Sequence, residues 1–210
     1  MSMDSIAQGN AGAGVERNPN HPRKGSSIKV EPIRRMGDIR TIKALLLPSP
    51  RDLALFTLGI NTSLRASELV EITAGMVTGV DAGGDLEIKQ RKTGRYRRIT
   101  LNASCIAATR DLLASRAYRQ SDPLFVGQRG PITPIYVNHL VKKWTRMINL
   151  EGNYGSHSLR KTWGYHQRVT FNVPAPILME CFGHSTQRQT LAYLCIQDEE
   201  VRSVYQNVIG

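Results

Sequence analysis

Two arginine-containing segments carry residue types that could act on a phosphodiester. Arg65 lies in TSLRASEL, with Glu68 one turn later, and Arg160 follows His157 by three residues in HSLRKT, a spacing that places both side chains on one helical face. Phosphoryl transfer develops negative charge on the non-bridging oxygens, which arginine binds through a planar, permanently charged fork. A lone arginine near a helix start is usually a solvated or salt-bridged residue, so these two segments alone indicate little.

The spacing of two further segments strengthens that interpretation. In GHSTQRQTLAY, His184 precedes Tyr193 by nine residues, and Tyr193 lies 33 residues after Arg160. Lys92 lies upstream, in the turn-forming segment KTGRYRRI between two strand-like runs. In this order, LRASEL, KTGRYRRI, HSLRKTWGYH and FGHSTQRQTLAY resemble the motifs of the tyrosine recombinases, also called phage integrases. The resemblance covers roughly residues 38 to 205.

The resemblance implies a role for each matching residue. Tyr193 would attack the scissile phosphate, forming a 3′-phosphotyrosyl link and leaving a free 5′-hydroxyl. Arg65 and Arg160 would bind the non-bridging oxygens, and Glu68 would orient Arg65. Lys92, before Thr-Gly, would protonate the departing 5′ oxygen, and Lys89 is the alternative for that role.

The two histidines and the remaining basic residues would have supporting roles. By the same resemblance, His157 would help Tyr193 to lose its proton, and His184 would donate a hydrogen bond to a non-bridging oxygen. As isolated residues, both histidines would more often be structural. Direct contacts with DNA are expected from the basic residues of the hairpin and of the second arginine segment: Lys89, Arg91, Arg95, Arg97, Arg98 and Lys161.

The charge of the chain favours a polyanionic partner. Its 28 lysines and arginines exceed its 17 acidic residues, which gives a net charge of +11 and a pI of about 10.0. Each phosphate that such a surface neutralises releases condensed counterions, so double-stranded DNA is the expected partner, although a merely solvated basic surface is the alternative. No HExxH motif or carboxylate cluster indicates a metal site. The resemblance implies no cofactor, because a phosphotyrosine conserves the bond for religation without metal or ATP.

Nothing in the sequence indicates secretion or a membrane span. No uncharged apolar run reaches the roughly 18 residues that a span requires, and the N-terminal segment has no apolar signal-peptide core. Cys105, Cys181 and Cys195 form no CxxC pair, and their odd number argues against a disulfide framework. We therefore expect a cytoplasmic protein, associated with the nucleoid of a prokaryotic cell and encoded there or by a phage or mobile element.

The elements that must position these residues are mainly helical. Residues 76–80, 85–89 and 97–101 are β-branched or alternating runs separated by turn signals, and they predict a three-stranded antiparallel sheet. The fold class is therefore α+β, mainly α with one small sheet, as in a tyrosine recombinase catalytic domain. Helices are predicted over 38–47, with Asp38 as N-cap, after Ser49, over 65–70 and 103–118, and over 134–149, 157–170, 175–182, 187–196 and 198–208.

Two domain assignments follow from composition. Residues 1–32 are rich in Gly, Asn, Ser and Ala, and are predicted to be a disordered basic tail, because they cannot bury enough apolar surface to offset their ordering entropy. Residues 33–210 are assigned to the catalytic domain. Members of the family typically carry a helical core-binding domain before it, and no full domain of that kind is visible here.

The C-terminal segment QDEEVRSVYQNVIG carries an apolar stripe. Val201, Val204, Tyr205 and Val208 recur at helical spacing. In the family such a segment docks on a neighbouring protomer, which implies a homotetramer on DNA, but packing on its own domain explains the stripe equally well. Tyr205 is also the nearest rival nucleophile, although it lacks the Gly-His spacing.

Three functions remain open at this point. The first is an active DNA strand transferase, which the complete set of motif residues favours, because a protein that only binds DNA needs no nucleophile. The second is a non-catalytic DNA-binding relative that regulates a full-length recombinase, which the missing core-binding domain favours. The third is a type IB topoisomerase, which uses similar residues but would not need a docking tail.

Overall fold

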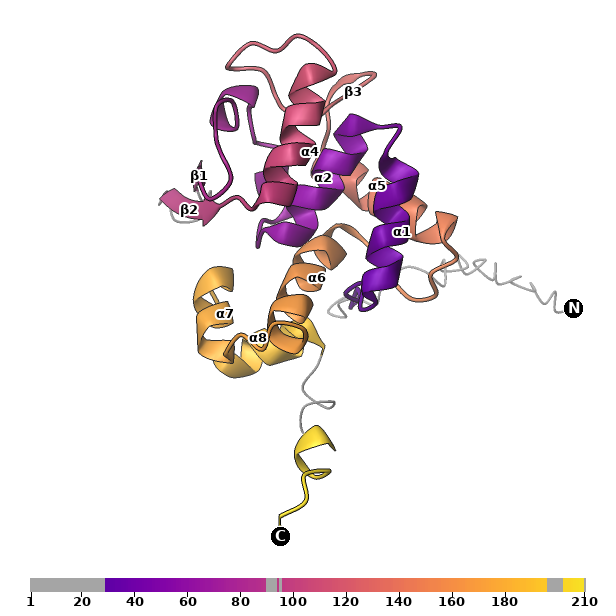
Figure 1. Cartoon of the computed structure of the whole chain (residues 1–210), viewed down its shortest axis with the longest axis vertical. Coiled ribbons are helices and arrows are strands. Elements are labelled where there is room, and N and C mark those ends of the chain that lie inside the picture. Colours follow the sequence, from indigo (N-terminus) through magenta and orange to yellow (C-terminus); the bar gives the residue numbers. More distant parts are fainter. Residues whose placement is uncertain (1–28, 90–93, 95, 196–201, 210) are drawn as a thin grey trace, which may run out of the picture.

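Helices form most of the architecture in the computed structural model, which describes residues 29–89, 94, 96–195 and 202–209 (Figure 1). The elements follow one another as α1 (Met36–Leu46), α2 (Pro50–Asn61), α3 (Ala66–Leu69), the 3-10 helix η1 (Ala74–Met76), β1 (Asp85–Lys89), β2 (Tyr96–Thr100), α4 (Ala103–Ala114), β3 (Val126–Gly127), β4 (Gly130–Pro131), α5 (Pro134–Met147), α6 (Ser156–Val169), α7 (Ala175–Phe182) and α8 (Gln187–Leu194). The mainly helical fold class predicted from the sequence is confirmed.

Local sequence signals explain where several helices begin. Pro50 occupies the first turn of α2, where its missing N–H costs nothing. The side chains of Asn102 and Thr133 accept backbone N–H bonds at the starts of α4 and α5. The prediction of Asp38 as a cap is wrong, because α1 already begins at Met36 and Asp38 lies in its first turn. A carboxylate there still complements the positive end of the helix dipole.

The first of the three predicted strands is absent from the part of the chain that the structure describes. Residues 76–80 lie instead at the end of η1 and in the following turn, where Gly79 adopts a φ of 74°. Val77 is buried there, so the apolar character of this run reflects core packing rather than an extended strand. The remaining two strands pair antiparallel, with Asp85 opposite Thr100 and Lys89 opposite Tyr96, and β3 and β4 form a second, short hairpin.

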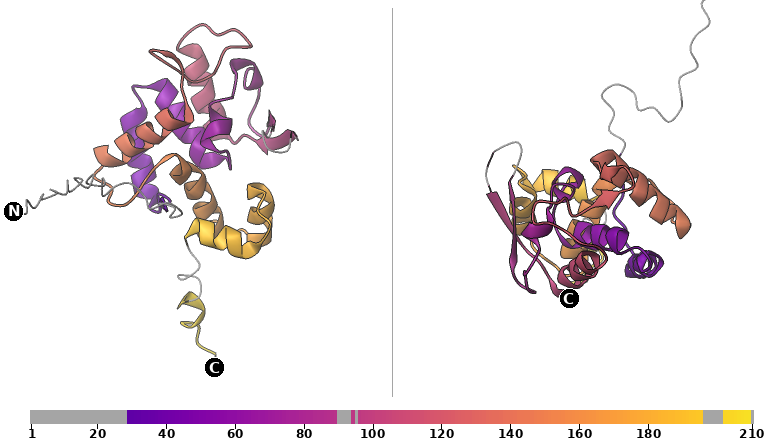
Figure 2. Two further views of the ribbon diagram at one scale, coloured as in Figure 1. Left: turned by 180° about the vertical axis from the view of Figure 1, so that it is seen from behind. Right: turned by 90° about the horizontal axis from the view of Figure 1, so that it is seen from above.

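Helix α6 lies between two apolar clusters. The larger cluster includes Phe56 of α2 and Trp144 of α5, which pack edge to face with their ring centroids 5.7 Å apart. The smaller cluster consists of Leu178, Phe182 and Leu194 from α7 and α8. Because α6 contacts α2 and α5 as well as α7 and α8, it joins the main body to the α7–α8 pair, which Figures 1 and 2 show set apart from that body.

The two ends of the chain differ in part from the predicted elements. Residues 1–28 of the predicted tail lie outside the described residues. The end of that segment is in contact with the folded body, because Glu31 N–H donates to the Asn153 carbonyl at 2.8 Å, and Ile33, which follows it, is fully buried. The helix predicted over 198–208 falls partly outside the described residues, and its described part is helical only at 202–204. Among the described helices, none is long and apolar enough to cross a membrane.

The contact between α6 and the α7–α8 pair requires a glycine at position 164. A Cβ at Gly164 would lie 2.5 Å from Phe182 Cζ and from Leu194 Cδ2. We predict that Gly164→Ala lowers the free energy of unfolding by about 1–3 kcal/mol, the usual cost of overpacking. Denaturant unfolding measures this change. Gly37→Ala is the matched helical control, because nothing lies within 4 Å of its added Cβ. Equal stability of the two variants would contradict the close packing.

Candidate active site

A buried carboxylate surrounded by three guanidinium groups forms the centre of the site. Glu68 Oε1 lies 3.1 Å from Nη1 of Arg65, while its Oε2 lies 3.5 Å from Nη2 of Arg97 and 3.9 Å from Nη1 of Arg160. The Glu68 side chain is only 7% exposed. Three positive charges thus face one negative charge, and the net excess of two makes this cluster a strong site for an anion.

The helix α3 positions the first arginine. Arg65 directly precedes α3, and its backbone N–H donates to Glu68 Oε2 at 2.7 Å, closing the first turn. This bond holds the carboxylate beneath the arginine, whose own side chain is 46% exposed. Glu68 therefore contacts a cation that still reaches the surface.

Arg160 of α6 is held almost entirely within the protein. It is 2% exposed, and its guanidinium donates to the carbonyl of Ser63 and, at 2.8 Å, to that of Phe182. Burial, together with the positive charge of Arg65, lowers its pKa to about 10. Arg160 therefore stays charged at neutral pH, in a position fixed by two main-chain segments that lie far apart in the sequence.

An aromatic cluster brings His184 and Tyr193 next to the arginines. The ring of Phe182 stacks on His184 at a centroid distance of 5.1 Å and packs against Tyr193 at 5.3 Å. The Arg160 guanidinium lies over the same Phe182 ring at 4.8 Å. His184 Nδ1 also forms a hydrogen bond with the Thr190 hydroxyl at 3.0 Å, which fixes the orientation of its imidazole.

The Tyr193 hydroxyl is buried close to the Arg160 guanidinium, and no described residue forms a hydrogen bond of normal geometry with it. Burial raises the pKa of Tyr193, while the charges of Arg160 and Arg65 act in the opposite direction. The tyrosine is therefore a neutral phenol at neutral pH, and it must lose its proton during any nucleophilic attack. A hydroxyl left unpaired beside fixed cations is typical of a catalytic group rather than of a structural one.

His157 of α6 is suited to receive a proton. Partial burial lowers its pKa, and the positive charges of Arg160, Lys161 and Arg65 lower it further. Its imidazole is accordingly neutral at neutral pH, the state that a general base requires. The pKa of His184 is lowered as well, first by burial and then by Arg160 and Arg65.

The structure brings together six residues singled out from the sequence and leaves others apart. Arg65, Glu68 and Arg160 form one cluster with His157, His184 and Tyr193, as their contacts and electrostatic coupling show. Lys92, Arg91 and Arg95 lie outside the described residues.

The residues expected to contact DNA do not all reach the surface. Lys89 and Arg98 are exposed on the hairpin, and Arg98 pairs with Glu87 at 2.8 Å. Arg97 turns inward to Glu68. Lys161 is 5% exposed, and its ammonium lies 3.3 Å from Cys195 Sγ and 5.0 Å from the centroid of the Tyr193 ring.

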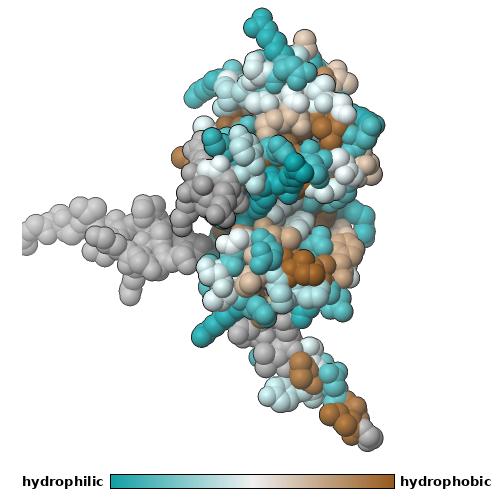
Figure 3. Space-filling model, turned by 90° about the vertical axis from the view of Figure 1, so that its left-hand side faces the viewer, coloured by the Kyte–Doolittle hydropathy of each residue, from teal (hydrophilic) through white to brown (hydrophobic). Residues whose placement is uncertain are grey.

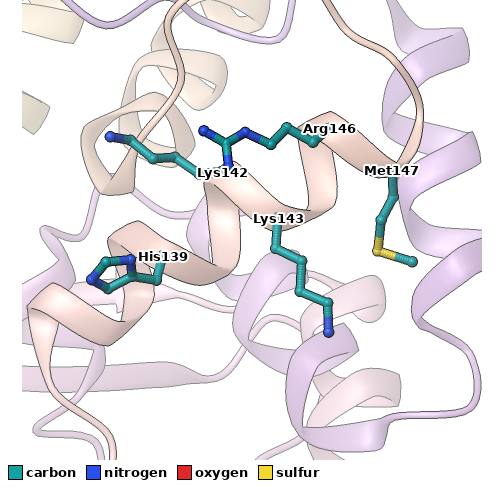
Figure 4. Close-up of a pocket in the computed structure, with 5 residues that line it drawn as sticks. All are labelled: His139, Lys142, Lys143, Arg146 and Met147. Carbon is teal, nitrogen blue, oxygen red and sulfur yellow. The ribbon is translucent and has the colours of Figure 1, made fainter. Parts of the chain in front are cut away.

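Sequence reasoning missed a basic face on α5. His139, Lys142, Lys143 and Arg146 recur at helical spacing and line a shallow pocket with Met147, and Figure 4 shows Lys142 and Arg146 extending from the same side of the helix. The signal was present in HLVKKWTR, because buried Leu140, Val141 and Trp144 alternate with these cations. The helix predicted over 134–149 was not divided into a buried face and a basic face.

Phe182 and Ser63 were also missed. Each contacts Arg160 through its main-chain carbonyl, a role that no side-chain pattern reveals. Among the described residues, no group of three or more His, Cys, Asp or Glu side chains could hold a metal ion.

The geometry can bind a phosphate, place a tyrosine hydroxyl beside it and accept a proton at a neutral imidazole. Residues 39–200 match the model of the phage integrase family. The chain therefore belongs to the phage integrase family, and the resemblance inferred from its four motifs is confirmed.

Curated relatives agree with this assignment. The chain is 31% identical over 184 residues to the probable integrase/recombinase YoeC of Bacillus subtilis (strain 168), an alignment that covers 84% of this chain and 95% of YoeC. It is 34% identical over 157 residues to the tyrosine recombinase XerC of Caldanaerobacter subterraneus subsp. tengcongensis. That alignment covers 72% of this chain but only 43% of the XerC protein.

Solved structures share the fold. XerA recombinase superposes with a TM-score of 0.69 at 17% identity, over 84% of this chain and 65% of XerA. XerH recombinase, in a post-cleavage complex with palindromic difH substrate, gives a TM-score of 0.67 at 18% identity over 87% of this chain and 55% of XerH. The fold is therefore that of a tyrosine recombinase catalytic domain, and the chain spans between about half and two thirds of these larger proteins.

The electrostatic origin of the neutral His157 can be tested by NMR titration. We predict that His157 titrates below the usual value of 6.5 and that Lys161→Gln moves its pKa upward, because removing a nearby positive charge favours the imidazolium. A His157 pKa at or above 6.5 in the native chain would contradict the arrangement.

Proposed function

We propose that this chain cleaves and rejoins DNA strands through a covalent 3′-phosphotyrosine at Tyr193, as a site-specific recombinase whose catalytic domain is 33–210. The observation that carries the proposal is the excess of positive charge around Glu68, next to the unpaired Tyr193 hydroxyl. Such a site neutralises a phosphodiester and its more highly charged transition state. Membership of the phage integrase family supports it.

In the proposed reaction the scissile phosphate lies between the arginines and the tyrosine. Arg65 and Arg160 bind its non-bridging oxygens, and His184 donates a hydrogen bond to one of them. Tyr193 Oη attacks phosphorus while its proton passes to neutral His157. The bond from phosphorus to the 5′ oxygen breaks, and Lys92 supplies the proton to that oxygen.

The reverse reaction rejoins the strand. A 5′-hydroxyl attacks the phosphotyrosine, the tyrosine leaves, and one phosphodiester replaces another. Because the number of phosphoester bonds is unchanged, the cycle requires no ATP, and the arginines provide the charge neutralisation that a metal ion would otherwise supply.

The proposed DNA-binding surface combines the site with two basic elements. The α5 face of His139, Lys142, Lys143 and Arg146 and the exposed hairpin residues Lys89 and Arg98 can neutralise several backbone phosphates. XerH and a lambda integrase dimer were solved on difH and COC′ core-site DNA, respectively, and their shared fold supports the same partner here.

The C-terminal segment is the proposed contact between protomers in a homotetramer on DNA. Val204, Tyr205, Val208 and Ile209 are 63%, 86%, 90% and 98% exposed, and Figure 3 shows apolar side chains at this end of the chain. Apolar side chains exposed to this extent gain free energy when a neighbouring surface covers them.

Covalent trapping on nicked, random-sequence duplexes tests the proposal directly. Cleavage close to a nick releases a short fragment and leaves the enzyme attached to DNA. We predict denaturation-resistant adducts with the native chain, in buffer containing EDTA and no ATP. Tyr193→Phe should form none while its affinity for duplex DNA stays nearly unchanged, because one hydroxyl contributes little to the electrostatic binding.

Tyr205→Phe is the matched control, since Tyr205 is the nearest rival nucleophile and is 86% exposed. It should form adducts at the native level. Adducts that persist in Tyr193→Phe but vanish in Tyr205→Phe would move the nucleophile, and binding without adducts in the native chain would reject the enzyme.

The role of Lys92 is tested by changing the leaving group. We predict that Lys92→Ala slows cleavage by roughly 10² to 10⁴, as loss of a general acid does. A substrate with sulfur in place of the bridging 5′ oxygen should restore the rate, because a thiolate leaves without protonation. Lys89→Ala, on the same hairpin, should need no rescue. A Lys92→Ala defect that sulfur leaves unchanged would assign Lys92 to phosphate binding.

A further inference from the structure

Arg97 occupies an inward position on the hairpin. It lies on β2, its side chain is 16% exposed, and its Nε and Nη2 atoms are buried without a hydrogen-bond partner among the described residues. The accessible remainder lines a hollow with Arg98, Trp163 and Glu180. Arg97 therefore faces Glu68 rather than the outer surface of the hairpin.

The guanidinium of Arg97 joins two parts of the site instead. Its Nη1 donates to the carbonyl of Cys181 at 2.9 Å, and its Nη2 lies 3.5 Å from Glu68 Oε2. Cys181 belongs to the last turn of α7, and Glu68 carries the carboxylate that binds Arg65. One side chain of the hairpin thus spans the distance from the α3 carboxylate to the end of α7.

The end of α7 determines where His184 lies. The helix stops at Gly183, which adopts a φ of 64°, and His184 follows directly. Two arginines bind its last carbonyls: Arg97 binds that of Cys181, and Arg160 that of Phe182 at 2.8 Å. Cations are favourable at the negative end of a helix, and here they also fix its position.

We propose that Arg97 is a positioning residue of the reaction centre. It holds the Glu68 carboxylate in place for Arg65 and anchors the end of α7. His184 and the phosphate-binding arginines therefore keep fixed positions relative to one another. This inference rests on the proposed strand-transfer function and describes how the residues of its site are held in position.

Position 110 offers a matched control. Arg110 of α4 carries the same charge, its side chain is 63% exposed, and it pairs with Asp81 at 2.6 Å. Arg97→Gln and Arg110→Gln therefore change net charge equally, while only the first removes the link between Glu68 and Cys181. Arg97→Lys keeps the charge but loses the planar fork, and it provides a conservative variant where Arg97→Gln is too unstable.

Single-turnover cleavage at saturating enzyme, on a site recovered by trapping, gives the first readout. Two duplexes are compared: one with the natural scissile phosphodiester and one with a methylphosphonate there, which lacks one charged oxygen. Arg97→Gln should slow cleavage of the diester by about 10- to 100-fold, the equivalent of one charge-assisted hydrogen bond. Arg97→Gln should slow cleavage of the methylphosphonate by a smaller factor, because this linkage has less negative charge for the arginines to neutralise. Arg97→Lys should fall between native and Arg97→Gln, and Arg110→Gln should match the native rate.

The second readout needs no catalysis. In an NMR titration, Arg97→Gln and Arg97→Lys should move the pKa of His184 back toward 6.5, because a released α7 no longer holds the imidazole in its buried setting beside Arg160. Arg110→Gln should leave the pKa of His184 at the native value. This titration decides the inference even if the native chain forms no adducts, an outcome that would reject the proposed function separately.

Three results would overturn the inference. Equal loss on both duplexes would make Arg97 a general structural residue. A native cleavage rate with reduced duplex affinity and a shallower salt dependence would make it a phosphate contact like Arg98. An unchanged His184 titration in both Arg97 variants would show that the end of α7 does not depend on it.

Discussion

The balance of charge around Glu68 is the interaction on which the rest of the site depends. One buried carboxylate cannot neutralise the three guanidiniums that approach it, and burial makes their mutual repulsion expensive. The protein offsets this cost with main-chain carbonyls, which accept hydrogen bonds from Arg97 and Arg160 without adding a full charge. The remaining positive potential stays available for an incoming anion, in an arrangement that needs no reorganisation when the anion binds.

The fold supplies those carbonyls from two separate packing units. Ser63 lies in the segment after α2, which packs in the larger apolar cluster. Cys181 and Phe182 lie in α7, which packs in the smaller one. Arg160, on the helix between them, binds one carbonyl of each unit. The geometry of the candidate site is therefore coupled to the docking of the α7–α8 pair on α6, to which the close approach at Gly164 contributes.

The sequence predicted most helices because their caps and apolar spacing are local properties, as at Pro50 and Thr133. The strand predicted over 76–80 was wrong. The β-branched residues suggested a strand, but the segment forms a turn at Gly79 and buries Val77 in the core. The motif residues were identified by type and order. The inward orientations of Arg97 and Lys161 were not, because the partners that draw them in, Cys181 and Cys195, are distant in sequence.

In the proposed reaction, the same cations would help a largely buried tyrosine to act as a nucleophile. Burial raises the pKa of Tyr193, and Arg160 and Arg65 only partly oppose this effect. A phosphate bound to those arginines would cancel much of their help, so the attack of Tyr193 would be coupled to proton transfer rather than preceded by ionisation. Burial and the charges of Arg160, Lys161 and Arg65 lower the pKa of His157. The charge cluster proposed to bind the phosphate would therefore also maintain the base that this phenol requires.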